Sequence, residues 1–184
     1  MKYLRKFNEN TNIWEKWEEE ELDDSFMLWL EQYYPDKSKW NQITEIDCSY
    51  RNLYSLHGID KLTNLKNLNC QYNNLTSLER IENLTNLKRL DCFDNNLNSL
   101  EGIDKLINLN SLFCWNNNLT SLEGIENLTK LKYLYCNNNN LTSLKEIEKL
   151  TKLERLFCSN NNFNNQEKNR IVQFCIENDI YLDI

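Results

Sequence analysis

The sequence predicts an α/β repeat fold: a solenoid of stacked coils with a parallel β-sheet on its concave side and short 3₁₀ or irregular segments on its convex side. The first observation is a period, because six cysteines stand 22 residues apart, at Cys48, Cys70, Cys92, Cys114, Cys136 and Cys158. The second is that leucines and asparagines repeat in the same phase, as in LKNLNCQYNNLTSLERIENLTN of residues 65–86. A fixed period of this length is typical of solenoids, in which each unit packs on its neighbours.

Each unit is expected to form one short strand followed by a turn and a back segment. Leu68 and Cys70 alternate with Asn67, Asn69 and Gln71, which is the period of a strand with one buried face. The later apolar positions of the unit are expected to point inward as well: Leu75, Leu78, Ile81 and Leu84. A single coil cannot bury its apolar edge, so we expect the coils to stack, at about 4.8 Å per parallel strand.

The pattern L-x-x-L-x-C-x-x-N-x-L, which runs from Ile43 to about Phe163, resembles the leucine-rich repeat. The 22-residue unit is similar to the short class found in internalins and phosphatase regulatory subunits. This resemblance implies a leucine-rich-repeat solenoid that binds its partner through the concave sheet. The Cys- and Asn-rich variant of the unit is similar to repeats of giant viruses and low-GC bacteria, and a viral source would imply the host cytoplasm.

We divide the chain into an N-terminal cap (residues 1–42), six repeats of which the last is truncated (43–163), and a C-terminal cap (164–184). Open solenoids need caps because their first and last coils expose apolar edges. In the C-terminal cap, Asn164 and Asn165 are predicted to begin a helix that ends at Glu177. Residues 180–184 are predicted to form a final strand.

The N-terminal cap is predicted to hold a β-hairpin and a helix. Apolar residues in segments 3–7 and 13–17 flank a polar turn, and FMLWLEQYY (26–34) precedes Pro35, which ends a helix. Four tryptophans are expected to seal the first coil: Trp14, Trp17, Trp29 and Trp40. The acidic run Glu18–Glu21 is interpreted as solvated charge, with docking of a basic partner as the alternative.

Two ladders are expected to be structural. Five asparagines just after the strands should bond the backbone of the turns: Asn73, Asn95, Asn117, Asn139 and Asn161. Arg51 takes this place in the first coil, so the ladder should begin one coil late. The six in-phase cysteines are interpreted as buried, inert thiols, because a line of thiols does not give the tetrahedral ligands of a zinc site.

Composition argues against several function classes. The net charge of −7 disfavours nucleic acid and anionic membrane as partners. Seven cysteines and the absence of a recognisable signal peptide favour a reducing, intracellular compartment. His57, the only histidine, falls at an outer, solvent-facing phase, and no nucleophile–base pair is found, so no enzyme, metal or cofactor is expected. Gly58, Gly102 and Gly124 share a phase with Arg80 and Glu146, which suggests that the backbone there does not require glycine.

The candidate binding site lies on the concave face, where residues beside each buried leucine and cysteine point outward. Coils three to six bring aromatic residues to these positions, with charged residues at their border: Phe93, Phe113, Trp115, Tyr133, Tyr135, Phe157, Arg89, Arg155 and Asp91. Aromatic and arginine side chains are common anchors of interfaces. We therefore predict a protein-binding surface centred on Phe113, Trp115 and Tyr135.

Three alternatives remain open at this stage. The aromatic rings could serve only to stabilise the sheet by stacking on one another. The same face could join two copies of the chain in a homodimer. It could also bind glycans, because aromatic rings beside Asn and Asp suit sugars. The leading hypothesis is an adaptor or regulator that binds a protein partner.

Overall fold

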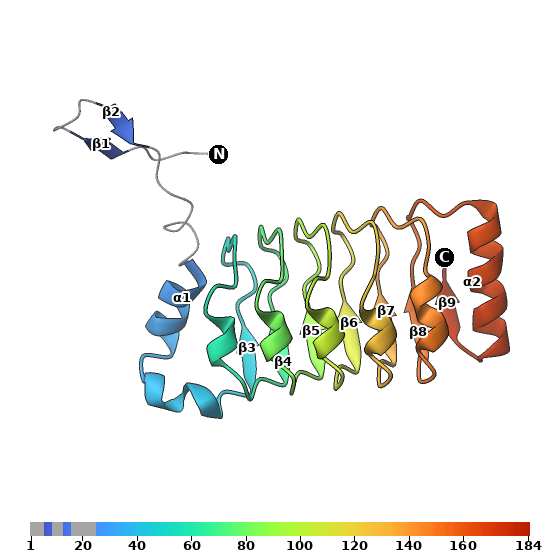
Figure 1. Ribbon diagram of the computed structural model, residues 1–184, viewed down its shortest axis with the longest axis horizontal. Helices are drawn as coiled ribbons and strands as arrows, with labels where there is room; N and C mark the ends of the chain where they lie inside the picture. The colour runs from blue at the N-terminus through green and yellow to red at the C-terminus, as the bar shows by residue number, and fades with distance from the viewer. Residues whose placement is uncertain (1–5, 9–12, 16–24) are drawn as a thin grey trace.

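The computed structural model describes residues 6–8, 13–15 and 25–184, and it confirms the predicted solenoid (Figure 1). Seven parallel strands form one open sheet in sequence order. They are β3 (Glu45–Asp47), β4 (Asn67–Asn69), β5 (Arg89–Asp91), β6 (Ser111–Phe113), β7 (Tyr133–Tyr135), β8 (Arg155–Phe157) and β9 (Tyr181–Asp183). Two further strands, β1 (Lys6–Asn8) and β2 (Ile13–Glu15), pair antiparallel with Phe7 opposite Trp14.

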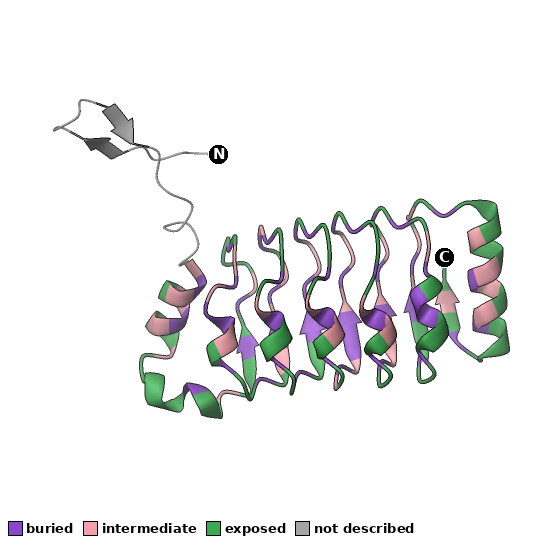
Figure 2. Ribbon diagram, in the orientation of Figure 1, coloured by how far each residue is buried: buried purple, intermediate pink, exposed green. Residues whose placement is uncertain are grey.

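Neighbouring repeat strands pair in a register equal to the sequence period. Leu68 of β4 lies opposite Leu90 of β5, and Leu90 opposite Leu112 of β6. These leucines are buried and the cysteines two residues later are fully buried, whereas the residues between them face the concave side. The in-phase repeat therefore stacks identical apolar side chains into one continuous core, drawn in purple in Figure 2.

The convex side carries short 3₁₀ turns, which lie in front of the sheet in Figure 1. They are η3 (Ile59–Lys61), η4 (Ile81–Asn83), η5 (Ile103–Lys105), η6 (Ile125–Asn127) and η7 (Lys145–Lys149). The isoleucine of each turn is buried and packs into the core behind the sheet. None of the helices in residues 25–184 is long and apolar enough to cross a membrane.

The residue before these turns shows why glycine recurs at this phase. Gly58, Gly102 and Gly124 have φ values of 89°, 85° and 99°, and Arg80 also has a positive φ, of 67°. Glu146 does not have a positive φ, because it lies inside the longer turn η7. Glycine is thus favoured but not required at this phase: four of the five coils turn left-handed there, and Arg80 adopts this conformation although it disfavours a Cβ.

The asparagine ladder is confirmed, including its late start. Asn73 accepts hydrogen bonds from the Arg51 and Leu53 N–H groups of the first coil, at 3.1 and 2.9 Å. Its amide nitrogen donates to the carbonyls of Cys48 and Cys70, at 3.0 and 2.9 Å. The later asparagines repeat this pattern, so each one joins two coils through backbone groups that have no partner in the sheet.

The cysteines also occupy their predicted structural place. All seven are free and buried. The Cys48 thiol lies 3.4 Å from the Asn69 carbonyl, and Cys70 lies at the same distance from the Asp91 carbonyl. Burial raises the pKa of Cys48 and of Cys158 to about 12, so these thiols stay protonated and unreactive at neutral pH.

The N-terminal side of the solenoid is covered by α1 (Ser25–Tyr33), which ends before Pro35 as predicted, and by η2 (Lys37–Gln42). Phe26 and Leu30 are fully buried. Trp40 is also buried and donates its indole N–H to the Tyr34 carbonyl at 2.8 Å, while Trp29 packs partly buried against the core. Three of the features expected in this cap lie outside the described residues: the side chain of Trp14, Trp17, and the run Glu18–Glu21.

The C-terminal side is covered by α2 (Asn165–Glu177), where the sequence predicts a helix. Asn164 caps it by accepting the Glu167 N–H at 2.8 Å. Ile171 and Cys175 face the core. The chain then returns as β9, which pairs with β8 and continues the sheet over its last repeat strand (Figure 1).

Candidate binding surface on the concave sheet

Three rows of outward side chains run across the concave face, one residue per coil in each row. The first row begins each strand: Glu45, Asn67, Arg89, Ser111, Tyr133, Arg155 and Tyr181. The second ends each strand: Asp47, Asn69, Asp91, Phe113, Tyr135, Phe157 and Asp183. The third follows each cysteine: Ser49, Gln71, Phe93, Trp115, Asn137 and Ser159. All six row positions of the first two coils are polar, whereas six of the twelve in coils three to six carry aromatic rings.

The predicted aromatic residues do come together. The rings of Phe93 and Trp115 stack at 3.7 Å with an interplanar angle of 14°. Phe113 meets Tyr135 edge to face at 4.9 Å, and Tyr135 lies 4.2 Å from Phe157. Because parallel strands hold successive side chains about 5 Å apart, in-phase rings are forced into contact.

Tyr133, the sixth predicted aromatic residue, behaves differently. No ring contact is found for it in the described part of the chain, and its hydroxyl donates to Glu154 at 3.1 Å. Tyr133 stands in the first row, between Ser111 and Arg155, so the strand register separates it from the aromatic rows. It therefore stands at the border of the aromatic rows rather than at their centre.

The ring contacts extend further than the sequence predicts. Tyr50 and Tyr72 stack at 4.2 Å, and Tyr72 lies 5.5 Å from Phe93. At the other end Phe157 lies 5.5 Å from Tyr181 of β9. We call the resulting continuous set the aromatic strip: Tyr50, Tyr72, Phe93, Phe113, Trp115, Tyr135, Phe157 and Tyr181.

Sequence reasoning misses the ends of the strip for identifiable reasons. Tyr50 and Tyr72 stand one residue after the third row, where the later coils carry Asp94 and Asn116, so they fall outside the outward strand pattern. Their φ values of 57° and 53° are unusual for tyrosine, whereas Asp and Asn accept this conformation more readily. A tyrosine at a phase that favours Asn is the signal that could have identified them.

Exposure differs along the strip. Tyr50 and Tyr181 are exposed by 66% and 61%, whereas the central rings from Phe93 to Phe157 are half-buried, because they cover one another. The two stacked pairs, Tyr50–Tyr72 and Phe93–Trp115, use ring faces in internal contact. At these pairs each ring therefore has one face occupied by its neighbour.

Arg89 is held in place at the border of the strip. Its Cζ lies 4.6 Å from the centre of the Phe113 ring, and its Nε donates to Asp91 at 2.9 Å. Half of the Arg89 side chain stays exposed. Arg155, the other predicted arginine, is also exposed, and no hydrogen bond or ring contact is found for its guanidinium among the described residues.

The sequence predicts that Asp91 is exposed on the concave face, but the structure buries it. The residue is only 7% exposed, and its Oδ1 is buried without a hydrogen-bond partner in the described structure. This burial raises the pKa of Asp91, although the Arg89 guanidinium acts in the opposite direction. Asp91 is thus a positioning residue beneath Arg89 rather than a contact residue.

Two further observations concern metal-ligating side chains and the single histidine. Among the described residues no cluster of three or more His, Cys, Asp or Glu is placed to hold a metal ion. His57, expected at a solvent-facing position, is half-buried. Its place on the convex side, next to the start of η3, separates it from the concave rows.

Comparison with known proteins gives a consistent result. The family model for leucine-rich repeats (two copies) matches residues 63–106, 107–144 and 129–168, and so spans more than half of the chain. A search of curated proteins finds no match.

Among solved structures, an internalin C2 from Listeria monocytogenes superposes with a TM-score of 0.61 at 18% identity, over 88% of this chain and 82% of that one. An internalin F from Listeria monocytogenes gives a TM-score of 0.53 at 21% identity, over 76% of this chain and 48% of that one. The chain thus spans about half the length of the second structure. At these identities the likeness is one of fold.

Proposed function

The chain belongs to the leucine-rich-repeat family, whose members typically act as protein-interaction modules, and we propose that it is a non-enzymatic adaptor or regulator that docks a protein partner on its concave sheet. The observation that carries the proposal is the aromatic strip, which crosses the sheet from the first coil to β9. Aromatic side chains bury a large area at low conformational cost and are enriched in interfaces.

The geometry of the rings favours a protein over a glycan. Sugars stack on exposed ring faces, whereas at the centre of the strip Phe93 and Trp115 each have one face occupied by the other ring at 3.7 Å. One face of Phe113 lies under Arg89. Ring edges and half-buried rings suit the aliphatic groups, carbonyls and aromatic faces that a polypeptide presents. The seven unpaired thiols fit the reducing, intracellular setting that forms part of this proposal.

The test is affinity capture with mass spectrometry, which compares the wild type with a Phe113→Ala/Trp115→Ala/Tyr135→Ala variant. We expect partners retained by the wild type to fall at least about ten-fold in the variant, because hot-spot aromatics each contribute about 2 kcal/mol or more. The matched control is Tyr54→Ala/Ile107→Ala/Ile176→Ala, which removes three exposed apolar side chains outside the strip. Its partners should be unchanged.

Two outcomes would contradict the proposal. If the strip variant is folded by circular dichroism and keeps every partner, the concave face is not the docking surface. Light scattering after size exclusion tests the homodimer alternative. A concentration-dependent dimer that the strip variant abolishes would show that the face binds a second copy of the chain instead.

A further inference from the structure

A shallow, open hollow lies beside the aromatic strip, at the N-terminal ends of β5 and β6. Its volume is about 550 Å³, and it is lined by Lys88, Arg89, Asn108, Asn110, Ser111 and Lys130. Three of these residues are cationic and none is acidic. Of the other three, Asn108 donates its amide N–H to the Thr85 carbonyl at 2.9 Å and Ser111 donates its hydroxyl to Asn110 at 3.4 Å, and the amide nitrogen of Asn110 is a further donor. The lining is therefore suited to an anion, although the whole chain carries a net charge of −7.

The guanidinium of Arg89 is already oriented for binding an anion. Its Nε is bonded to Asp91 at 2.9 Å and its plane rests over Phe113, so the guanidinium has a fixed orientation. Neither of its terminal nitrogens has an acceptor among the described residues. A guanidinium held in this way offers two parallel donors that match a carboxylate, and little side-chain entropy is lost on binding.

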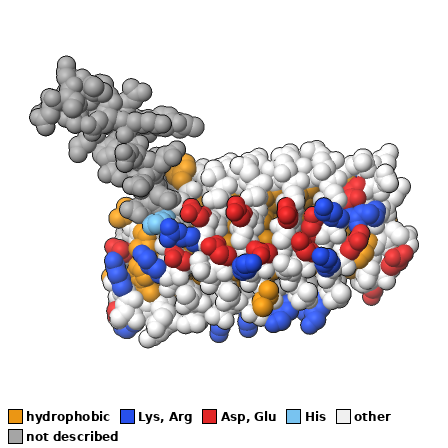
Figure 3. Space-filling view, viewed as in Figure 1, with side chains coloured by type: hydrophobic (Ala, Val, Ile, Leu, Met, Phe, Trp, Pro, Cys, Tyr) orange, Lys and Arg blue, Asp and Glu red, His pale blue; other side chains and the backbone are white. Residues whose placement is uncertain are grey.

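The surroundings extend the positive charge of the hollow. In the loops that enter the strands, Lys66 and Lys152 join the lining lysines Lys88 and Lys130. Lys130 bonds Asn108 at 2.6 Å, and no partner is found for the other three among the described residues. Figure 3 shows Lys and Arg side chains in succession along the lower margin, whereas Asp and Glu gather across the middle of the viewed face. This margin is complementary to an acidic partner segment.

We infer that the hollow binds the carboxylate of an Asp or Glu side chain from the partner, and that a neighbouring apolar residue of that partner packs on the aromatic strip. The inference rests on the proposed function and specifies the partner as an acidic–apolar polypeptide segment. A singly charged group fits better than a phosphate dianion, because Asp91 beneath Arg89 offsets part of the positive charge.

The experiment is selection of random peptides displayed on phage against the full chain. We expect the selected peptides to be enriched in Asp or Glu next to aromatic or aliphatic residues. One selected peptide is then synthesised with a fluorescent label, and its affinity is measured by anisotropy. Arg89→Gln should weaken binding about ten-fold, as should Gln in place of the acidic residue of the peptide. Raising the salt concentration should also weaken it.

Lys145→Gln is the matched control, because it removes the same charge from an exposed position of the convex side. Its affinity should equal that of the wild type, and thermal unfolding of Arg89→Gln should confirm that the variant is folded. The inference is overturned if no peptide is enriched, if the enriched peptides lack acidic residues, or if a phosphoserine peptide binds more tightly than its acidic counterpart. If partners depend on the strip but not on Arg89, this inference fails while the proposed function stands.

Discussion

At the scale of single residues, one amide side chain per coil holds the turns together. Asn117 illustrates this: its Oδ1 accepts the Leu97 N–H at 2.9 Å, and its Nδ2 donates to the carbonyls of Cys92 and Cys114. The residue is 8% exposed, so water cannot replace these bonds. Buried backbone groups without partners cost free energy, which makes the ladder necessary to the fold.

Asn117→Ala is therefore expected to lower the free energy of unfolding by about 3 kcal/mol, because several buried backbone groups would lose their partner. Urea denaturation followed by circular dichroism measures the change. Asn118→Ala is the control, since the neighbouring amide is exposed and makes no side-chain hydrogen bond in the described structure. Equal stability of the two variants would show that the ladder is not needed.

Arg80 is the residue at which backbone strain can be tested. It has a φ of 67° where Gly102 and Gly124 occupy the same phase. Its contacts with Asp60 and Glu79 are long, 3.8 Å each, and partly exposed, so they contribute little.

Arg80→Gly should raise the free energy of unfolding by up to about 1 kcal/mol, because glycine removes the left-handed strain at some cost in unfolded-state entropy. Arg80→Ala is the control: it removes the same charge but keeps a Cβ in the strained conformation, so its stability should stay close to that of the wild type. Both are measured by chemical denaturation. A glycine variant no more stable than the alanine variant would rule out strain at this position.

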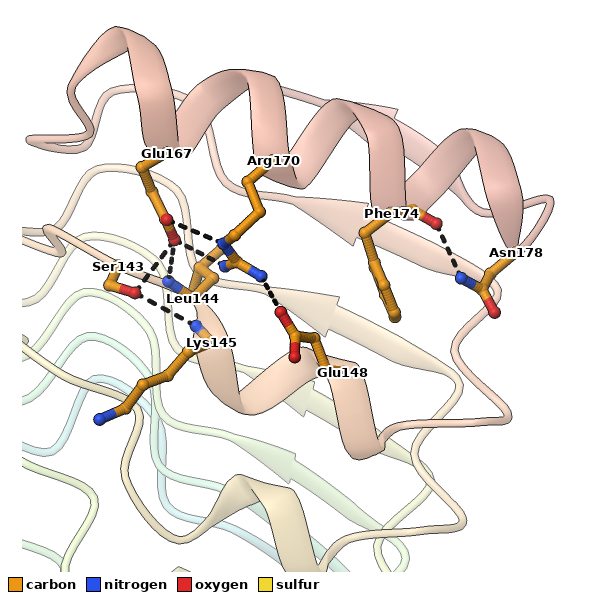
Figure 4. Close-up of polar contacts among 8 residues, drawn as sticks. All are labelled: Ser143, Leu144, Lys145, Glu148, Glu167, Arg170, Phe174 and Asn178. Carbon is orange, nitrogen blue, oxygen red and sulfur yellow. Dashed lines mark hydrogen bonds and ion pairs between the residues drawn. The ribbon is translucent and has the colours of Figure 1, made fainter.

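At the scale of elements, Glu167 connects α2 to the last turn of the solenoid (Figure 4). Its carboxylate accepts hydrogen bonds from the Arg170 guanidinium at 2.7 and 2.9 Å, from the Leu144 N–H at 2.7 Å and from the Ser143 hydroxyl at 3.0 Å. Arg170 in turn pairs with Glu148 of η7. These hydrogen bonds, that from Arg170 first, lower the pKa of Glu167 from its ordinary 4.5 to about 2.

A depressed carboxyl pKa stabilises the fold above the unfolded-state value and loses this effect as the pH falls toward the folded-state value. Glu167→Gln should accordingly lower the free energy of unfolding by roughly 2–3 kcal/mol at pH 7. The difference from the wild type should shrink as the pH falls from about 4.5 to 2. Urea titrations at several pH values measure it.

Glu101→Gln provides the control for the cap, because it removes a carboxylate from an exposed convex position. Its unfolding free energy should follow the wild type at every pH. If the difference between Glu167→Gln and the wild type were independent of pH, Glu167 would contribute through packing rather than through its charge.

At the scale of the whole molecule, the solenoid separates its side chains by face. The core takes the leucines, isoleucines and cysteines, and the concave sheet takes the aromatic strip. The viewed face carries Asp and Glu side chains across its middle, and Lys and Arg side chains follow its lower margin (Figure 3). Because every coil has the same form, any residue type placed at one phase in successive coils becomes a continuous row. A small number of substitutions per coil can therefore build a long surface without altering the core.

The period of the sequence by itself determined the coil, the register and the core, because a strand period of two and a repeat of 22 leave one arrangement that buries every in-phase leucine. It also located five of the eight rings of the strip, at Phe93, Phe113, Trp115, Tyr135 and Phe157.

Only the tertiary structure decided how these side chains are used. It buried Asp91 under Arg89, extended the strip to Tyr50 and Tyr181, and turned the backbone left-handed at Arg80. Each of these outcomes depends on contacts between neighbouring coils or on local backbone angles. The period of the sequence predicts which residues share a row, but it does not predict which side chains of neighbouring coils bury them.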